Sequence, residues 1–148
     1  MPERTFHRLP PGGLTEVTGA LAAAGLPTAD IDGARMTFFR LADDHGPLGW
    51  AALERHGSDA LLRSVLTAPD RRSSGVGTNL VQQVSASAVE EGVERLWLLT
   101  ESAAPFFARL GFAETPRAEA PAAMQETTEF RSVCPASATC MTLKLARP

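Results

Sequence analysis

A glycine-rich segment at 67–78 carries the strongest chemical signal in this sequence and reads Thr-Ala-Pro-Asp-Arg-Arg-Ser-Ser-Gly-Val-Gly-Thr. It lies between an apolar run and a long amphipathic segment, which predicts a strand, a tight turn and the start of a helix. Gly75 and Gly77 let the backbone approach a ligand closely, and the unpaired N–H groups of a first helical turn attract an anion. Arg71 and Arg72 can add charge-assisted contacts. The segment therefore predicts a phosphate-binding loop.

Two common phosphate-binding loops do not fit this segment. A Walker loop needs a lysine after its second glycine, and the only lysine in the chain is Lys144, far downstream. A dinucleotide-binding fingerprint needs a third glycine where this chain has Leu80, and it opens a βαβ unit instead of following a meander. What remains is the pattern Arg-x-x-Gly-x-Gly, from Arg72 to Gly77.

The elements that position this loop follow from periodicity and turn residues. Alternating or continuous apolar runs predict strands at 5–9, 36–42, 48–55, 60–67, 96–99, from 112, and at 139–145. Apolar residues at helical spacing predict helices at 14–24, 75–91, 103–110, and from Pro121 through Phe130. The order β-α-β-β-β-α-β-α-β-α-β predicts a mixed α/β sheet with antiparallel and parallel parts.

A second motif lies downstream, at 104–112, and reads Ala-Pro-Phe-Phe-Ala-Arg-Leu-Gly-Phe. In this order the two motifs resemble the acetyl-coenzyme A loop and the later Gly-Phe helix of GCN5-related N-acetyltransferases (GNAT). The stretches 98–107 and 120–141 resemble the arsenic-resistance (ArsN-type) subgroup, and more distantly amino-acid acetyltransferases of the N-acetylglutamate synthase kind. The resemblance covers most of the chain. It implies a central sheet of about six to seven strands, antiparallel in its N-terminal part, with a parallel pair around the cofactor cleft.

The resemblance also implies that the chain binds acetyl-CoA and transfers its acetyl group directly to an amine. Carried over residue by residue, backbone N–H groups of the Arg72–Thr78 segment bind the pyrophosphate. Backbone groups near Leu66 and Thr67 align the pantetheine and polarise the thioester carbonyl. The expected cofactor contacts are Leu66, Thr67, Arg71, Arg72, Ser73, Ser74, Gly75, Val76, Gly77, Thr78 and Phe107.

Phe107 stands where many relatives carry a tyrosine that protonates the departing thiolate, and this chain contains no tyrosine. A thiol with a pKa of about 8.5 leaves fairly well as a thiolate, so the loss of this acid slows the reaction and does not forbid it. Solvent and the hydroxyls of Thr100 and Ser102 are the candidate substitutes.

No general base stands out from residue type and position alone. Glu101 is the first candidate catalytic residue, because it follows the central strand, whose carboxyl end opens onto the reaction centre in such sheets. Glu54 and Glu129 are weaker candidates. Each of these carboxylates can instead be a solvated surface group, which is the commoner place for glutamate.

Arg63 lies in an apolar run that predicts a largely buried strand, where an unpaired charge is costly. The guanidinium either meets an internal carboxylate or binds the carboxylate of an amino-acid-like acceptor, and the sequence leaves both interpretations open. Arg63 and Thr100 are the candidate acceptor contacts.

Cys134 and Cys140 are the only two cysteines, too few for a disulfide framework or a zinc site of four thiolates. Free cysteines usually behave as small buried hydrophobic residues, and the alternative is that two soft thiolates bind a trivalent arsenical. No metal site is expected. His7, His45 and His56 fall in an edge strand and two turns, where we expect them to be solvated.

Length and charge limit the remaining choices. A chain of 148 residues predicts a single domain over 1–148, and a formal net charge of −3 argues against nucleic acid as a partner. No apolar run approaches the roughly 20 residues that a membrane span needs, and the sparse cysteines favour the cytoplasm.

These observations together predict a cytoplasmic, acetyl-CoA-dependent N-acetyltransferase. Its acceptor is expected to be a small, amino-acid-like amine, with an organoarsenical as one candidate and a homodimer as the candidate assembly. The alternative is a non-catalytic sensor that keeps the acetyl-CoA site and uses Cys134 and Cys140 to bind a metalloid.

Overall fold

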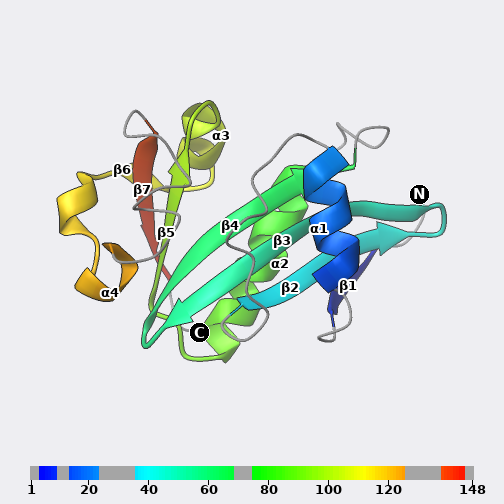
Figure 1. The fold of residues 1–148 in the computed structure, drawn as a ribbon, viewed down its shortest axis with the longest axis horizontal. Helices are drawn as coiled ribbons and strands as arrows, with labels where there is room; N and C mark the ends of the chain where they lie inside the picture. The colour runs from blue at the N-terminus through cyan, green and yellow to red at the C-terminus, as the bar shows by residue number, and fades with distance from the viewer. Residues whose placement is uncertain (1–3, 10–13, 24–35, 69–74, 126–137, 146–148) are drawn as a thin grey trace.

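A seven-stranded sheet, in the order β1-β2-β3-β4-β5-β7-β6, forms the centre of the described chain (Figure 1). The computed structural model describes residues 4–9, 14–23, 36–68, 75–125 and 138–145. The strands are β1 (Thr5–Arg8), β2 (Met36–Asp43), β3 (Gly46–His56), β4 (Asp59–Thr67), β5 (Arg95–Thr100), β6 (Ala113–Glu114) and β7 (Thr139–Lys144). The helices are α1 (Leu14–Ala23), α2 (Val76–Glu90), α3 (Ala104–Arg109) and α4 (Ala122–Gln125), with a 3-10 turn, η3, at Arg117–Glu119. The predicted mixed α/β fold and element order are confirmed.

Strands β1 to β4 pair antiparallel, as predicted, and β7 also pairs antiparallel with both β5 and β6. The turn between β2 and β3 is held by Asp43, whose Oδ1 accepts a 2.9 Å hydrogen bond from the backbone N–H of His45. At the edge of the sheet, the Phe6 ring of β1 stacks on Phe39 of β2 with ring centroids 5.2 Å apart. Cross-strand aromatic contacts of this kind fix the register of neighbouring strands.

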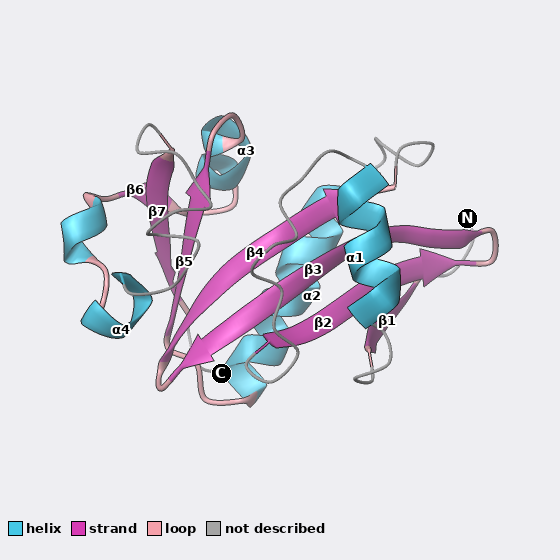
Figure 2. Cartoon of the chain, in the orientation of Figure 1, coloured by secondary structure: helices cyan, strands magenta, loops and turns pink. Residues whose placement is uncertain are grey.

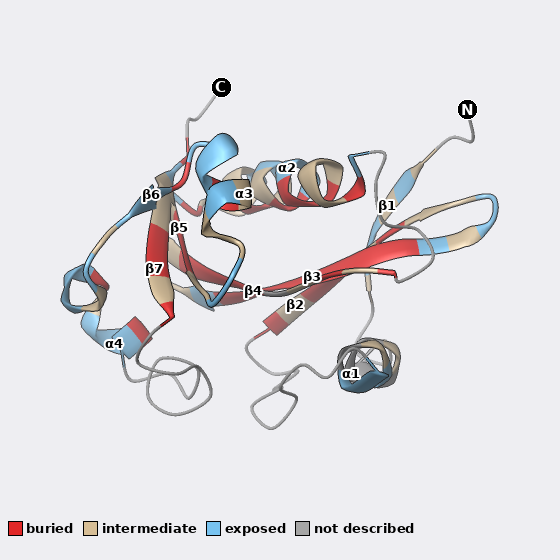
Figure 3. Ribbon diagram, turned by 90° about the horizontal axis from the view of Figure 1, so that it is seen from above, coloured by how far each residue is buried: buried red, intermediate tan, exposed pale blue. Residues whose placement is uncertain are grey.

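Helices cover both faces of the sheet. Figures 2 and 3 show α2 and α3 on one face, and α1 and α4 on the other. The main core lies under α2 and includes Phe39, Leu41, Leu53, Leu62, Leu80, Val84, Leu96 and Leu98. Smaller clusters lie on the opposite face: Met36, Phe38, Trp50, Ala52, Leu66 and Ala68 in one, and Leu61, Trp97, Ala120, Met124 and Cys140 in another.

Glu16 attaches α1 to the sheet through two hydrogen bonds. Its Oε1 accepts a 2.8 Å bond from Arg40 Nη1, and its Oε2 accepts a 2.6 Å bond from the indole Nε1 of Trp50. Both partners are on strands of the antiparallel part, β2 and β3. The carboxylate therefore sets where α1 lies on this face, because charge-assisted hydrogen bonds are the stronger and more directional kind.

Strands β4 and β5 are parallel but pair over only a short stretch. The described pairs run from Asp59 with Arg95 to Leu61 with Trp97. Beyond these pairs, β4 continues to Thr67 and β5 to Thr100 without described pairing between them, and Figure 1 shows the two strands diverging. We call the region between the diverging ends of β4 and β5 the gap; in the described chain, no backbone pairing joins the two strands across it.

The main difference from the sequence prediction concerns the segment after β6. The structure places η3 there, which was not predicted, and α4 is described over Ala122–Gln125. The rest of the predicted helix, up to Phe130, lies outside the described residues. In the described part of the chain, no helix has the length and apolar character that crossing a membrane requires.

Candidate active site

The first turn of α2 presents unpaired backbone N–H groups beside the gap. The first hydrogen bond of the helix runs from Asn79 N to Gly75 O at 2.9 Å, so the N–H groups of Val76, Gly77 and Thr78 have no acceptor within the helix. Gly75 precedes the helix in a left-handed conformation, with φ 72° and ψ 21°. In the described residues, no side-chain hydrogen bond caps the start of the helix. Apart from its chain neighbours and the helix backbone, no atom of the described residues lies within 4 Å of the position that a Cβ of Gly75 would occupy. This turn can therefore accept an anion.

The other predicted parts of the loop do not all fall within the described chain. Arg71, Arg72, Ser73 and Ser74 lie outside the described residues, so their contacts stay predictions. The Val76 side chain is buried in the main core, so it cannot contact an anion. Only the backbone N–H of Val76 is a candidate contact.

Gly77 has a packing role that the sequence did not indicate. A Cβ at this position would lie 3.1 Å from Cζ of Phe106 and 4.0 Å from Oγ1 of Thr67. Phe106 belongs to α3, which follows β5, whereas Thr67 ends β4. The missing side chain of Gly77 therefore lets the start of α2 lie close to α3 and to the end of β4.

Phe107 is a core residue in this structure. Its side chain is only 7% exposed, and its ring makes T-shaped contacts with Phe106 at 5.0 Å and Phe112 at 5.5 Å. Phe106, and not Phe107, is the phenylalanine of α3 that lies against Gly77 at the start of α2. A contact between Phe107 and the cofactor stays a prediction.

Leu66 and Thr67 line the end of β4 where it has separated from β5. They pair with Trp50 and Gly49 of β3 on the other side. Leu66 is buried against the α1 face, and Thr67 is half-buried. Their backbone is therefore fixed by β3 on one side and borders the gap on the other.

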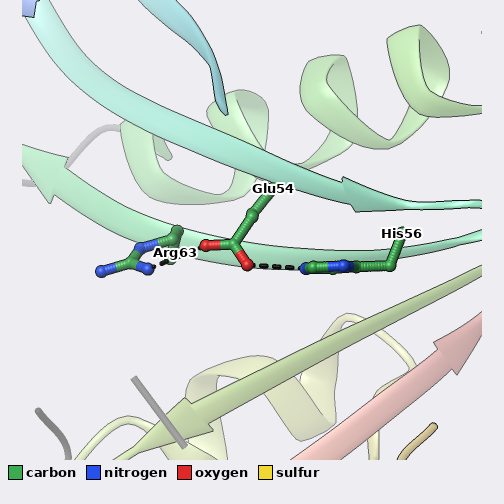
Figure 4. A network of polar contacts seen from close by, with 3 residues as sticks. All are labelled: Glu54, His56 and Arg63. Atoms are coloured by element: carbon green, nitrogen blue, oxygen red, sulfur yellow. Dashed lines mark hydrogen bonds and ion pairs between the residues drawn. The ribbon is translucent and has the colours of Figure 1, made fainter. Parts of the chain in front are cut away.

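A row of three polar side chains lies on the sheet face opposite α2. Figure 4 shows the Glu54 carboxylate between the Arg63 guanidinium and the His56 ring. Glu54 Oε1 accepts a 3.2 Å hydrogen bond from Arg63 Nη1, and Glu54 Oε2 lies 2.6 Å from His56 Nε2. The three side chains are between 3% and 9% exposed. We call Glu54, His56 and Arg63 the polar triad.

The polar triad settles one prediction and corrects another. Arg63 does meet an internal carboxylate, that of Glu54, which was one of its two interpretations. The expectation of a solvated His56 was wrong, because its side chain is 8% exposed and bonded to Glu54. The signal was present in the alternation of β3: Trp50, Ala52, Glu54 and His56 share one face, and the first two are apolar and buried.

The comparison with known families decides the identity of this fold. Residues 34–114, more than half of the chain, match the family model described as Acetyltransferase (GNAT) domain. The chain belongs to the GNAT family. The parallel pair of β4 and β5 and the start of α2 thus lie within a GNAT domain, as the resemblance implied.

Solved structures share the GNAT fold at low sequence identity. N-acetylglutamate synthase from Neisseria gonorrhoeae, complexed with coenzyme A and L-arginine, has a TM-score of 0.80 and 18% identity, covering 99% of this chain and 34% of its own. Rv2747 from Mycobacterium tuberculosis, in complex with CoA and NLQ, has a TM-score of 0.76 and 17% identity over 96% of this chain and 99% of its own. The ribosomal-protein-S18-alanine N-acetyltransferase from Escherichia coli has a TM-score of 0.68 and 18% identity, over 99% and 96%.

This chain therefore spans about a third of the N-acetylglutamate synthase chain that it matches. No curated protein matches the sequence significantly. Two of these neighbours contain coenzyme A, in agreement with the expectation of acetyl-CoA as the cofactor of this GNAT domain.

The candidate base and hydroxyl lie at the end of β5. Glu101 is exposed on the bend between β5 and α3. Thr100 is half-buried, and its Oγ1 accepts a 3.0 Å hydrogen bond from the backbone N–H of Ala103, so it organises the start of α3. Of the weaker base candidates, Glu54 is buried in the polar triad, and Glu129 lies outside the described residues.

Cys140 is buried at the start of β7, and Cys134 lies outside the described residues. Burial raises the pKa of the Cys140 thiol above its ordinary value of 9.0, and the charge of Arg117 partly opposes this shift. The thiol borders a cavity of about 480 Å³ lined by Glu114, Thr115, Pro116, Arg117, Ala138, Thr139 and Cys140. Cys140 itself therefore fits the small buried hydrophobic residue better than a reactive thiolate.

The remaining histidines behave as the sequence predicted. His7 and His45 are exposed. Within the described ranges, no group of three or more His, Cys, Asp and Glu side chains could hold a metal ion.

Proposed function

We propose that this GNAT domain transfers the acetyl group of acetyl-CoA to the amine of a small acceptor that carries a carboxylate. One observation carries the proposal: the uncapped start of α2 and the buried Arg63 lie on opposite faces of the sheet, beside the same gap. An anionic cofactor and an anionic acceptor can thus approach from opposite faces and meet between β4 and β5.

The residues at the start of α2 fit the pyrophosphate of the cofactor. The N–H groups of Val76, Gly77 and Thr78 are unpaired within the helix, and the open space at Gly75 leaves room for an oxygen to approach. Arg71, Arg72, Ser73 and Ser74 would extend this site by charge and hydroxyl groups. When bound, acetyl-CoA supplies an activated acetyl thioester.

The end of β4 would align the pantetheine of acetyl-CoA, the part that links the pyrophosphate to the thioester. Leu66 and Thr67 are held by β3, so their backbone groups toward the gap are already ordered before a ligand arrives. Polar groups that are ordered in advance stabilise developing charge without the cost of reorganising. Phe107 would support the start of α2 indirectly, because its ring packs against Phe106 and Phe112 in the core.

Arg63 would bind the carboxylate of the acceptor. It lies two positions beyond Leu61, the last residue of β4 that pairs with β5, and therefore at the point where the gap begins. A guanidinium has five N–H donors, so it can bind one carboxylate of the protein and a second one of a ligand. Free amino acids and related small amino acids are the acceptor class that this arrangement favours.

Proton transfer would use groups at the end of β5 and solvent. An amine attacks only through its free lone pair, so its proton must leave to a base or to water. Glu101 is exposed at the carboxyl end of β5 and is the candidate base, with Thr100 beside it. Because the chain has no tyrosine, it offers no phenol as an acid, and positioning of the two reactants supplies most of the acceleration.

Narrower proposals remain from the sequence. The ArsN-type resemblance supports an organoarsenical amino acid as one acceptor of the proposed class, and the domain is expected to act in the cytoplasm, with a homodimer as the candidate assembly. The rival function, a metalloid sensor that relies on Cys134 and Cys140, is less favoured because the raised pKa of Cys140 disfavours a thiolate.

Substitution of Arg63 tests the proposed acceptor site. Arg63→Gln should raise the KM of an amino-acid acceptor, because the acceptor carboxylate loses a charge-assisted hydrogen bond. The KM of acetyl-CoA should stay within about twofold of the wild-type value. The matched control is the carboxamide of the same amino acid, whose KM should not respond to Arg63→Gln. Equal effects on both acceptors, or on acetyl-CoA, would contradict the proposal.

A further inference from the structure

We propose that Glu54 and His56 are positioning residues that act through Arg63 and hold its guanidinium where the acceptor carboxylate binds. The inference rests on the proposed function, because it concerns the acceptor side of the same site. It assigns a role to two residues that the catalytic reaction does not otherwise use.

Both oxygens of the Glu54 carboxylate are held by named partners. Oε1 accepts the bond from Arg63 Nη1 at 3.2 Å, while Oε2 lies 2.6 Å from His56 Nε2. A carboxylate that pairs with a guanidinium accepts hydrogen bonds, so we assign the proton of the second bond to His56 Nε2. His56 therefore fixes the rotation of the carboxylate, and the carboxylate in turn directs the guanidinium.

The burial of the polar triad makes this restraint strong. The side chains of Arg63, His56 and Glu54 are 3%, 8% and 9% exposed, respectively. Hydrogen bonds between charged groups are stronger away from bulk water, and a buried charge without its partner is costly. The guanidinium consequently has few alternative positions when Glu54 is in place.

The position of Glu54 and His56 argues against a direct part in proton transfer. Glu54 pairs with Leu61, and His56 pairs with Asp59, where β4 and β5 are still joined as a parallel pair. Asp59, which faces His56 across the strand pair, accepts a 2.9 Å hydrogen bond from the indole Nε1 of Trp97. Arg63 is the member of the polar triad that lies where the strands diverge, so the other two reach the acceptor only through it.

A pair of His56 variants separates positioning from simple packing. His56→Phe removes the donor and keeps a planar ring, whereas His56→Gln keeps a donor that can reach Glu54. We expect His56→Phe to raise the KM of an amino-acid acceptor about tenfold, the size expected for one misdirected charge-assisted hydrogen bond, and His56→Gln to restore most of it. The KM of acetyl-CoA should stay within about twofold of the wild type. His7→Phe, at an exposed histidine of β1, is the matched control.

The acceptor pair used above supplies the decisive control. The KM of the best amino acid of a panel should rise in His56→Phe, whereas the KM of its carboxamide should not, because the carboxamide does not need the guanidinium charge. Equal losses for both acceptors, or a His56→Gln protein as impaired as His56→Phe, would overturn the positioning role. A drop in thermal stability alone, with unchanged KM values, would overturn it as well.

Direct binding of N-acetyl-L-glutamate, measured by calorimetry, distinguishes failure of this inference from failure of the proposed function. Binding that weakens in both Arg63→Gln and His56→Phe, in a protein that transfers no acetyl group, would refute the transferase and leave the positioning role standing. Acetyl transfer with binding unaffected by His56→Phe would refute the positioning role only. No binding and no transfer in the wild type would overturn both.

Discussion

Glu54 Oε1 lies 3.2 Å from Arg63 Nη1, although both side chains are almost fully withdrawn from solvent. Facing strands β3 and β4 bring the two together, with Arg63 paired to Ala52 and Glu54 paired to Leu61. A buried ion pair adds little net stability compared with apolar packing, so its presence under a proposed acceptor site points to a functional constraint.

Removal of one partner of this pair should destabilise the fold. Glu54→Ala leaves Arg63 and His56 without their carboxylate, and breaking a buried ion pair costs about 3–5 kcal/mol in the free energy of unfolding. Urea unfolding followed by circular dichroism measures this change. The exposed Glu114→Ala should shift the same free energy by less than about 0.5 kcal/mol, and comparable losses in the two variants would contradict the burial of the pair.

Gly77 and Phe106 should be energetically coupled. Gly77→Ala places a Cβ 3.1 Å from Phe106 Cζ, so the Phe106 ring must give by a few tenths of an ångström, and the KM of acetyl-CoA should rise. Phe106→Leu frees space and should relieve this effect in the double variant. A double-mutant cycle should give a coupling free energy of about 0.5–3 kcal/mol, and strict additivity would rule out the contact.

Phe107→Tyr should raise kcat, because it places a phenol where the resemblance implies that relatives carry their acid. The buried hydroxyl should also cost about 1–3 kcal/mol in the free energy of unfolding if it finds no partner. The pH–rate profile is the measurement: the variant should gain an alkaline limb near a tyrosine pKa of about 10 that the wild type lacks. Phe106→Tyr is the control, and an equal gain in kcat there would argue against a specific position.

Cys140 should make stability fall at alkaline pH. Its pKa is raised in the fold, so between the ordinary value of 9.0 and the raised value the folded state holds a proton that the unfolded state has lost. Stability from this group is therefore complete below about pH 9 and decreases as the pH rises further. Urea unfolding at several pH values should show a steeper alkaline decline for the wild type than for Cys140→Ala, and parallel curves would contradict the raised pKa.

The fold was largely predictable because its signals are local. Apolar spacing along α2 and the turn residues between β2 and β3 indicate their elements directly, and the order of elements then limits the sheet. The extra turn at Arg117–Glu119 was not predicted, because none of its residues is buried and no apolar spacing marks it.

The candidate site was predictable only where the backbone defines it. The start of α2 followed from two glycines, whereas the polar triad depends on which strand lies beside which. His56 looked like a turn residue, although the alternation of β3 places it on the face of Glu54, and the pairing of β3 with β4 adds Arg63 to that face. Gly77 was explained by ligand approach, yet its neighbour is Phe106, a residue of another helix.

Release of free coenzyme A thiol from acetyl-CoA, followed with a panel of amino acids and their carboxamides, tests the central claim most directly. The account predicts that at least one amino acid accelerates thiol release well above the rate without an amine, that its carboxamide does so far less, and that mass spectrometry finds the N-acetylated amino acid. Tight binding of acetyl-CoA with thiol release that no amine accelerates would contradict the transferase and favour the sensor.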